Sequence, residues 1–146
     1  MINAYTHGAT AWLTLTGRLL MAAIFLISGI GKLAAPAATI GYIASQGLPF
    51  ASIDYLAAVV IEIGGALLLM TGYRTRLTAM LLAGFTIATA LVFHHAIDDQ
   101  NQLIHLLKNL AMAGGLLQVA ASGAGALSVD ACLNLKRNAA PGLGRA

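Results

Sequence analysis

Charged residues are scarce in this chain. Only 9% of its 146 residues are charged, whereas 59% are hydrophobic, and soluble domains carry about 25% charged residues. A chain this short buries only part of its surface when it folds alone, so it cannot hide that much apolar surface from water. The composition therefore excludes a water-soluble domain, and the mean hydropathy of +0.83 agrees with this.

Cysteine is nearly absent as well. The lone Cys132 excludes an intrachain disulfide and a CxxC redox pair, and with them a thiol oxidoreductase that relays electrons through paired cysteines. The net charge is +3, but the eight basic residues are too few and too scattered for binding to nucleic acid. They fit loop charges that orient a membrane protein.

Four long apolar segments are present instead, each near the roughly 20 residues that cross a 30 Å hydrocarbon core. They run approximately over residues 12–33, 53–72, 77–94 and 103–121. The expected fold is all-α: an integral membrane four-helix bundle that forms a single domain over residues 1–146. A short interfacial helix, starting at Pro36 and running through Gln46, is expected between spans 1 and 2. A covering loop that seals the bundle is the alternative for this segment.

The connections alternate in charge. Arg74 and Arg76 lie between the second and third spans, and Asp98 and Asp99 lie between the third and fourth. The tail over residues 122–146 is basic. By the positive-inside rule, the arginine turn and both termini are expected in the cytoplasm, which makes this tail cytoplasmic.

Ionisable side chains inside a bilayer cost about 2.5–3.5 kcal/mol each on insertion scales, and they usually face the bundle interior. Helical spacing gives the first, second and fourth spans one polar stripe each, and the simplest packing turns these stripes inward. The polar residues on these stripes are Arg18, Lys32, Glu62, His105, Lys108 and Asn109, and His94 and His95 close the third span.

A buried polar network is expected around Glu62, which lies near the midpoint of the second span. Arg18 and Lys108 are expected to reach its carboxylate from opposite sides, and Asn109 adds a donor. An outer vestibule is expected beyond this network, formed by Lys32, His94, His95 and His105.

Several interpretations fit such a network. One is a buried ion pair that only fixes the register of the helices. Histidines can bind a metal or haem, but their spacing here matches no metal motif, so no metal ligands are assigned. A quinone head group fits an apolar pocket with a few converging donors. No phosphate-binding loop, serine elbow or dinucleotide fingerprint is present, so no catalytic residue is assigned.

Four stretches resemble the DoxX family of small bacterial membrane proteins, in the family's order and across all four spans. They are GRLLMAAIFLISGIGKL (17–33), EIGGALLLMTGYRTRLTAMLLAGFT (62–86), FHH (93–95) and IHLLKNLAMAGGLLQVAA (104–121). The resemblance implies a multi-pass protein of the bacterial inner membrane. The family's motif positions correspond here to Arg18, Ser28, Lys32, Glu62, Arg76, His94, His105, Lys108 and Asn109.

The resemblance also implies a link to redox chemistry, because some relatives are associated with a thiosulfate:quinone oxidoreductase and others with assemblies that handle oxidative or thiol stress. The expected function is a redox-linked membrane subunit or scaffold, with quinone as the candidate cofactor and redox enzymes as candidate partner proteins. As an enzyme component, the chain is expected at most to be a non-autonomous subunit of a quinone-linked oxidoreductase. The alternatives are a small-solute or proton permease that uses Glu62, and a purely structural docking protein.

Overall fold

The computed structural model describes residues 2–139, and this range contains helices and no strands. The helices are α1 (Ile2–Ala34), α2 (Pro36–Ser45), α3 (Ala51–Thr71), α4 (Thr75–Phe93), α5 (Gln100–Ser122) and α6 (Val129–Ala139). Four segments are long and apolar enough to cross a membrane: Gly8–Ala34, Ala51–Thr71, Thr75–Phe93 and Gln100–Ser122. The predicted all-α fold with four spans and a short helix after the first is confirmed.

Local sequence signals explain where these helices begin and end. Pro36 opens α2, where its fixed φ suits a helix and its missing N–H costs nothing. Gly47 and Gly72 follow α2 and α3 with φ of 80° and 70°, a conformation that glycine adopts without strain. Asp99 caps α5 by accepting a hydrogen bond of 2.9 Å from the backbone N–H of Gln102.

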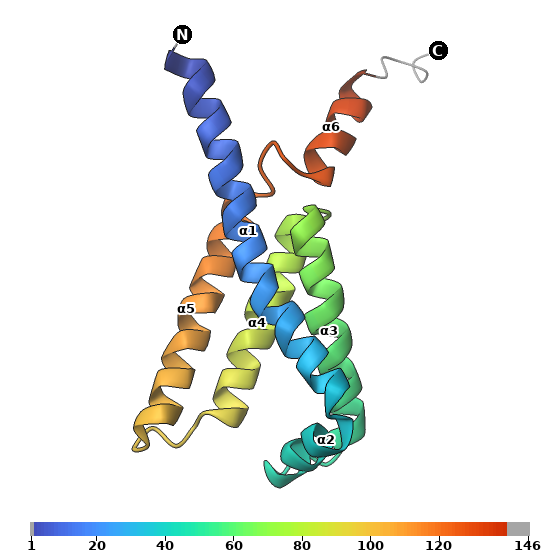
Figure 1. The fold of residues 1–146 in the computed structure, drawn as a ribbon, viewed down its shortest axis with the longest axis vertical. Coiled ribbons are helices and arrows are strands. Elements are labelled where there is room, and N and C mark those ends of the chain that lie inside the picture. The colour runs from blue at the N-terminus through green and yellow to red at the C-terminus, as the bar shows by residue number, and fades with distance from the viewer. Residues whose placement is uncertain (1, 140–146) are drawn as a thin grey trace, which may run out of the picture.

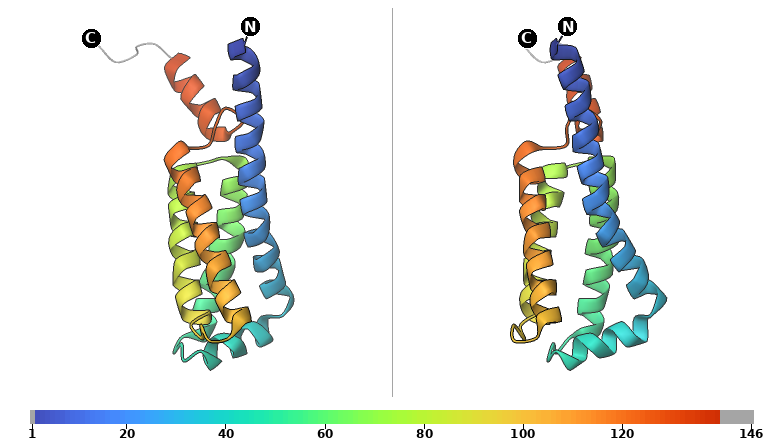
Figure 2. Two further views of the ribbon diagram at one scale, coloured as in Figure 1. Left: turned by 90° about the vertical axis from the view of Figure 1, so that its left-hand side faces the viewer. Right: turned by 60° about the vertical axis from the view of Figure 1, so that its left-hand side comes forward.

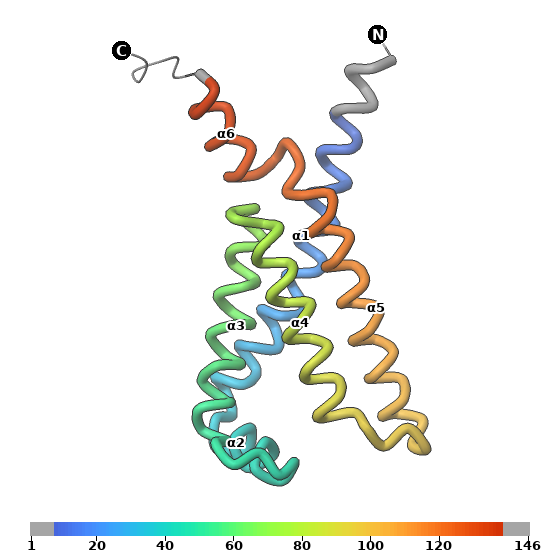
Figure 3. Tube along the Cα trace, turned by 180° about the vertical axis from the view of Figure 1, so that it is seen from behind, coloured from blue at the N-terminus to red at the C-terminus, as the bar shows by residue number. Residues whose placement is uncertain are grey.

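The bundle is built from two helix pairs. The most extensive contacts join α1 to α3 and α4 to α5, whereas α1 and α5 touch little. Figure 1 shows α1 crossing obliquely in front of the other spans, and Figures 2 and 3 show the two pairs diverging toward the end that carries α2. We call this the loop end. The opposite end, which carries the start of α1 and α6, is called the terminal end.

The shared core lies between the two pairs, away from the loop end. It contains fully buried side chains from all four spans, Ala22, Leu69, Leu82 and Leu116 among them. Most other large apolar side chains of the spans are exposed. That distribution is expected for helices whose outer faces contact lipid.

One helix is absent from the predictions. The sequence predicts only a tail over residues 122–146, whereas the structure forms α6 within it, at the terminal end (Figure 1). The last seven residues of that tail, 140–146, lie outside the described residues.

Candidate ligand-binding site

A buried ion pair joins α1 to α3 in the half of the bundle nearer the loop end. The ammonium of Lys32 lies 2.8 Å from Oε2 and 2.9 Å from Oε1 of Glu62, and it also donates to Oγ of Ser28 at 2.8 Å. The hydroxyl of Ser28 donates to Oε1 of Glu62 at 3.2 Å. The Glu62 side chain is 7% exposed and that of Lys32 is 24% exposed. All three protons of the ammonium therefore have an acceptor inside the protein.

A glycine sets the register of this pair. Ser28 and Lys32 are four residues apart on one face of α1, and Gly29 lies between them against α3. A Cβ added at Gly29 would lie 2.6 Å from Cγ1 of Ile63 and 3.3 Å from Cβ of Glu62. The absence of a side chain at Gly29 lets the two helices approach closely enough for the ammonium to reach the carboxylate.

The ion pair forms part of the wall of a cavity of about 770 Å³. Every span and α2 contribute to the lining, which is mostly apolar. The polar side chains that line it are Ser28, Lys32, Thr39, Tyr42, Asp54, Glu62, Thr89, His94 and Asn109. Asn109 is half-buried and has no hydrogen-bond partner among residues 2–139, so its amide is free to donate and accept within the cavity.

A smaller cavity of about 180 Å³ lies beside the first and shares five lining residues with it: Ser28, Glu62, Phe85, Thr89 and Asn109. Its remaining lining includes Phe25 and Met112. The carboxylate of Glu62 thus lies at the boundary between a large chamber near the loop end and a small chamber deeper in the bundle. Beyond Phe25 the cluster that contains Ala22, Leu69, Leu82 and Leu116 is apolar.

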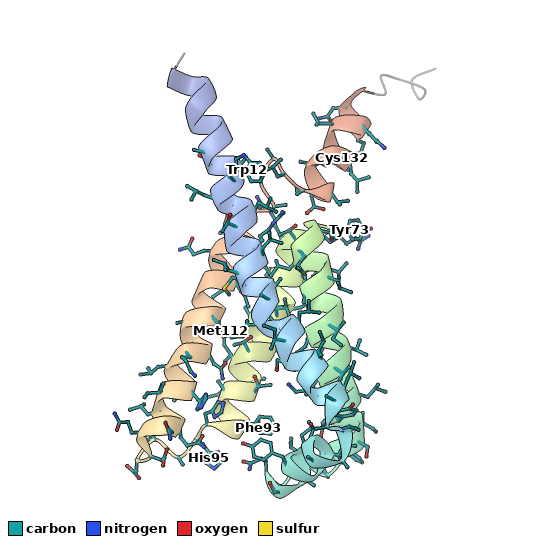
Figure 4. All side chains as sticks on the ribbon, viewed as in Figure 1. Trp12, Tyr73, Phe93, His95, Met112 and Cys132 are labelled. Atoms are coloured by element: carbon teal, nitrogen blue, oxygen red, sulfur yellow. The ribbon has the colours of Figure 1, made fainter. Side chains whose placement is uncertain are left out.

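Aromatic rings border the cavity at the loop end. The rings of Tyr42 on α2 and Phe93 at the end of α4 stack with centroids 5.5 Å apart. Figure 4 shows Phe93 beside α2. This contact connects α2 to the other helix pair and makes α2 a cover of the cavity.

The prediction that Arg18 and Lys108 pair with Glu62 is wrong. The cation that pairs with Glu62 is Lys32, which the sequence analysis assigned to the vestibule, and not Arg18 or Lys108. Arg18 precedes Lys32 by fourteen positions, which is about 21 Å at 1.5 Å per residue. Because α1 and α3 run antiparallel, this distance places Arg18 near the last turn of α3 and not near its middle.

Lys108 departs from the prediction for a different reason. Asn109 faces the cavity, but Lys108 is exposed and has no hydrogen bond or ion pair with any described residue. Adjacent residues of a helix differ by about 100° in direction, so both cannot face inward. Its long side chain can run along the helix with the ammonium in the interface.

The predicted vestibule assembles only in part. His94 lines the cavity, and its ring stacks on His105 with centroids 5.0 Å apart. Nδ1 of His94 lies 2.9 Å from Oε1 of Gln102. His95 is exposed and bonds the carbonyl of Val92, away from the other two. No group of three or more metal-ligating side chains comes together within the described residues.

Arg18 belongs to a second polar cluster, at the terminal end. Its side chain is fully buried. Nη1 donates to the carbonyl of Ala124 and Nη2 to that of Leu127, each at 2.7 Å. These bonds tie the connection between α5 and α6 to α1. We call this arrangement the arginine clasp.

Asp130 completes the clasp. Its carboxylate accepts hydrogen bonds from the backbone N–H groups of Arg74 and Thr75, at 2.8 and 2.9 Å, and so caps α4 from a distant part of the chain. Burial alone raises the pKa of this carboxyl, but those bonds and the charge of Arg18 hold the pKa below its ordinary value. The cap is therefore fully formed above about pH 4 and is lost as the pH falls through that lowered pKa.

Sequence reasoning did not assign several residues of these sites. Asp54 was recoverable as an acidic residue in an apolar span. Phe93 entered only as part of the FHH stretch, and Tyr42 and Asp130 gave no signal as site residues, because their contacts join elements far apart in the chain.

Four apolar helices of membrane-crossing length around a buried ion pair define a multi-pass integral membrane protein. The sequence model named DoxX matches residues 13–95. The inner membrane protein YqjF of Escherichia coli K12 is 37% identical over 122 residues, which cover 84% of this chain and 92% of YqjF. The inner membrane protein YphA of the same organism is 35% identical over 123 residues, covering 81% of this chain and 88% of YphA.

This chain belongs to the DoxX family. It is a multi-pass inner-membrane protein that sits in the lipid bilayer, as its relatives do. No solved structure matches it.

Proposed function

We propose that the cavity binds the head group of a quinone or quinol and that the chain serves as a redox-linked membrane subunit. The observation that carries this proposal is a cavity of about 770 Å³ whose wall contains the Lys32–Glu62 pair. The volume is within the 300–1,000 Å³ typical of small-molecule sites. The ring and tail of a quinone suit the apolar lining.

The polar groups of the cavity match the two ends of such a ring. A quinone carbonyl needs a donor, which the free amide of Asn109 supplies. A quinol hydroxyl needs an acceptor. The carboxylate of Glu62 has about four lone-pair positions, of which Lys32 and Ser28 use three, so one position on Oε2 is left for it. The aromatic side chains Tyr42, Phe85 and Phe93 provide faces against which the ring can stack.

A bound quinone would supply the redox chemistry, since it accepts two electrons and two protons. The chain's own part is to orient the ring, keep it out of water and hold a carboxylate at its hydroxyl. The electrons would come from a partner enzyme, in line with the redox-enzyme partners that the family resemblance implies. A membrane subunit of this kind is non-autonomous.

The permease interpretation has less support. The smaller cavity extends past Glu62, but the fully buried core of Ala22, Leu69, Leu82 and Leu116 lies beyond it. Four short helices leave little room for alternating access. A docking protein without a ligand would need no cavity at Glu62.

Native lipid extraction tests the proposal. We expect protein purified with its surrounding lipid to retain quinone, measured by mass spectrometry of the extract as a ratio to protein. Lys32→Met/Glu62→Gln, which keeps the side-chain volumes, should lower that ratio at least about tenfold, because a misplaced polar contact costs more than about 1.4 kcal/mol.

Lys108→Met is the matched control, since it removes an exposed ammonium from the same bundle, and it should retain quinone. A ratio no higher than that of the bulk membrane in the unaltered protein contradicts the proposal. Proton flux in quinone-free vesicles that depends on Glu62 would support the permease instead.

The orientation in the membrane is a further part of the proposal. Arg74 and Arg137 are at the terminal end, and the positive-inside rule places that end in the cytoplasm. Topology reporters fused at Arg74 and Arg137 should give the signal of a cytoplasmic location. Reporters fused at Gly47 and Asp99 should give the signal of an external location. An external signal at Arg137 would overturn this orientation.

A further inference from the structure

Helix α6 has one apolar face that nothing in the described chain covers. Val129, Cys132 and Leu133 lie at helical positions i, i+3 and i+4, which share one side. Val129 is 39%, Leu133 48% and Leu135 71% exposed, and Cys132 is exposed. The opposite side carries Asn134. An exposed apolar face on a helix outside the spans indicates a surface that meets something apolar.

The charged side chains around this face that have no partner are all cations. Lys136 and Arg137 are in the last turn of α6. Arg74 is in the neighbouring turn between α3 and α4, and Arg76 is in the first turn of α4. None of these four forms an ion pair, because Lys32–Glu62 is the one salt bridge that the described residues contain. The nearby carboxylate of Asp130 is already used by two backbone N–H groups. The cations therefore remain available to an external anion.

The position of α6 is that of a membrane interface. Figure 4 shows Trp12 and Cys132 at about the same level along the long axis, with Tyr73 lower, at the adjoining end of α3. The guanidinium of Arg74 lies 6.0 Å from the ring centre of Tyr73. Tryptophan and tyrosine concentrate at the headgroup level of bilayers. The arginine clasp anchors the connection that leads into α6 at this level.

We propose that α6 binds anionic phospholipids of the leaflet at the terminal end, with its apolar face among the acyl chains and its cations on the headgroup phosphates. An amphipathic basic helix next to a span binds a bilayer through both of these contributions. The anionic headgroups complement the unpaired cations, and the adjacent acyl chains cover the apolar face. A partner protein would need to supply both an anionic and an apolar surface at this one helix.

The single cysteine makes a direct test possible. The purified full-length chain is labelled at Cys132 with an environment-sensitive fluorophore. It is reconstituted into vesicles of phosphatidylcholine alone, or of phosphatidylcholine with phosphatidylglycerol. We expect a blue-shifted emission and several-fold protection from an aqueous quencher when phosphatidylglycerol is present. The matched control is Cys132→Ser/Asn134→Cys, in which the label on the polar side should remain accessible to the quencher.

A second variant tests the charges. Lys136→Gln/Arg137→Gln should raise several-fold the fraction of phosphatidylglycerol that gives half-maximal protection of Cys132, whereas the charge-preserving Lys136→Arg/Arg137→Lys should not. Labels that are equally quenched at both positions in both lipids would overturn the proposal. Equal protection in phosphatidylcholine alone would overturn the role of anionic lipid. Protection that appears only when membrane proteins are added back would assign the face to a partner protein.

Discussion

Lys32→Met should lower the free energy of unfolding by about 3–5 kcal/mol, because it leaves the carboxylate of Glu62 buried without its cation. Glu62 is 7% exposed on its side chain, and both of its oxygens lie within 2.9 Å of the ammonium. Glu62→Gln should be less damaging, since the amide oxygen still accepts from Lys32. Thermal unfolding in detergent compares the two variants with the unaltered protein.

The double variant Lys32→Met/Glu62→Gln should recover much of that loss, because replacing both members of a buried pair is far less costly than removing one. The control is Lys108→Met, whose exposed ammonium has no partner within residues 2–139, and it should change stability by no more than about 0.5 kcal/mol. If Lys108→Met were as damaging as Lys32→Met, the pairing seen here would be wrong. A double variant that folds but loses quinone assigns the pair to ligand binding; one that folds and retains quinone assigns it to helix register alone.

The second large effect is expected at the arginine clasp. Arg18→Met removes two hydrogen bonds of 2.7 Å from a fully buried guanidinium, and each bond to a charged group contributes about 1.5–3 kcal/mol. The connection between α5 and α6 should then detach, and limited proteolysis should cut it faster. Arg18→Lys should rescue only part of the loss, because one ammonium cannot span both carbonyls as the planar fork does.

A glycine beside the clasp gives a matched pair of variants. Gly72 has φ of 70°, and a Cβ there would collide with Nη1 of Arg18 and lie 2.6 Å from Cβ of Ser128. Gly47 has φ of 80° with open space around it. Gly47→Ala should therefore cost about 1–2 kcal/mol of backbone strain alone, and Gly72→Ala should cost clearly more. Equal losses of thermal stability would show that the clasp contributes nothing at this position.

Much of the fold was predictable because the bilayer restricts what a sequence can form. In a hydrocarbon core every backbone polar group needs an internal partner. Four apolar runs of about 20 residues therefore predict four membrane-spanning helices. Pro36 and Gly47 bracket α2 by local backbone preference alone. The low charge content made the remaining polar residues stand out, and Glu62, Asn109 and His94 do line the cavity.

The partners were decided only by the tertiary structure. The sequence shows how deep in its own helix each of Arg18, Lys32 and Lys108 lies. It does not show how far one helix is shifted along its neighbour, and that shift decides which cation is level with Glu62. That register depends on Gly29 meeting Ile63, a contact between residues more than thirty positions apart, and it selects Lys32 for Glu62. The same holds for Asp130, which caps a helix that begins 55 residues earlier. Spacing along one helix is fixed by its geometry, but pairing between helices depends on close packing, which the whole fold determines.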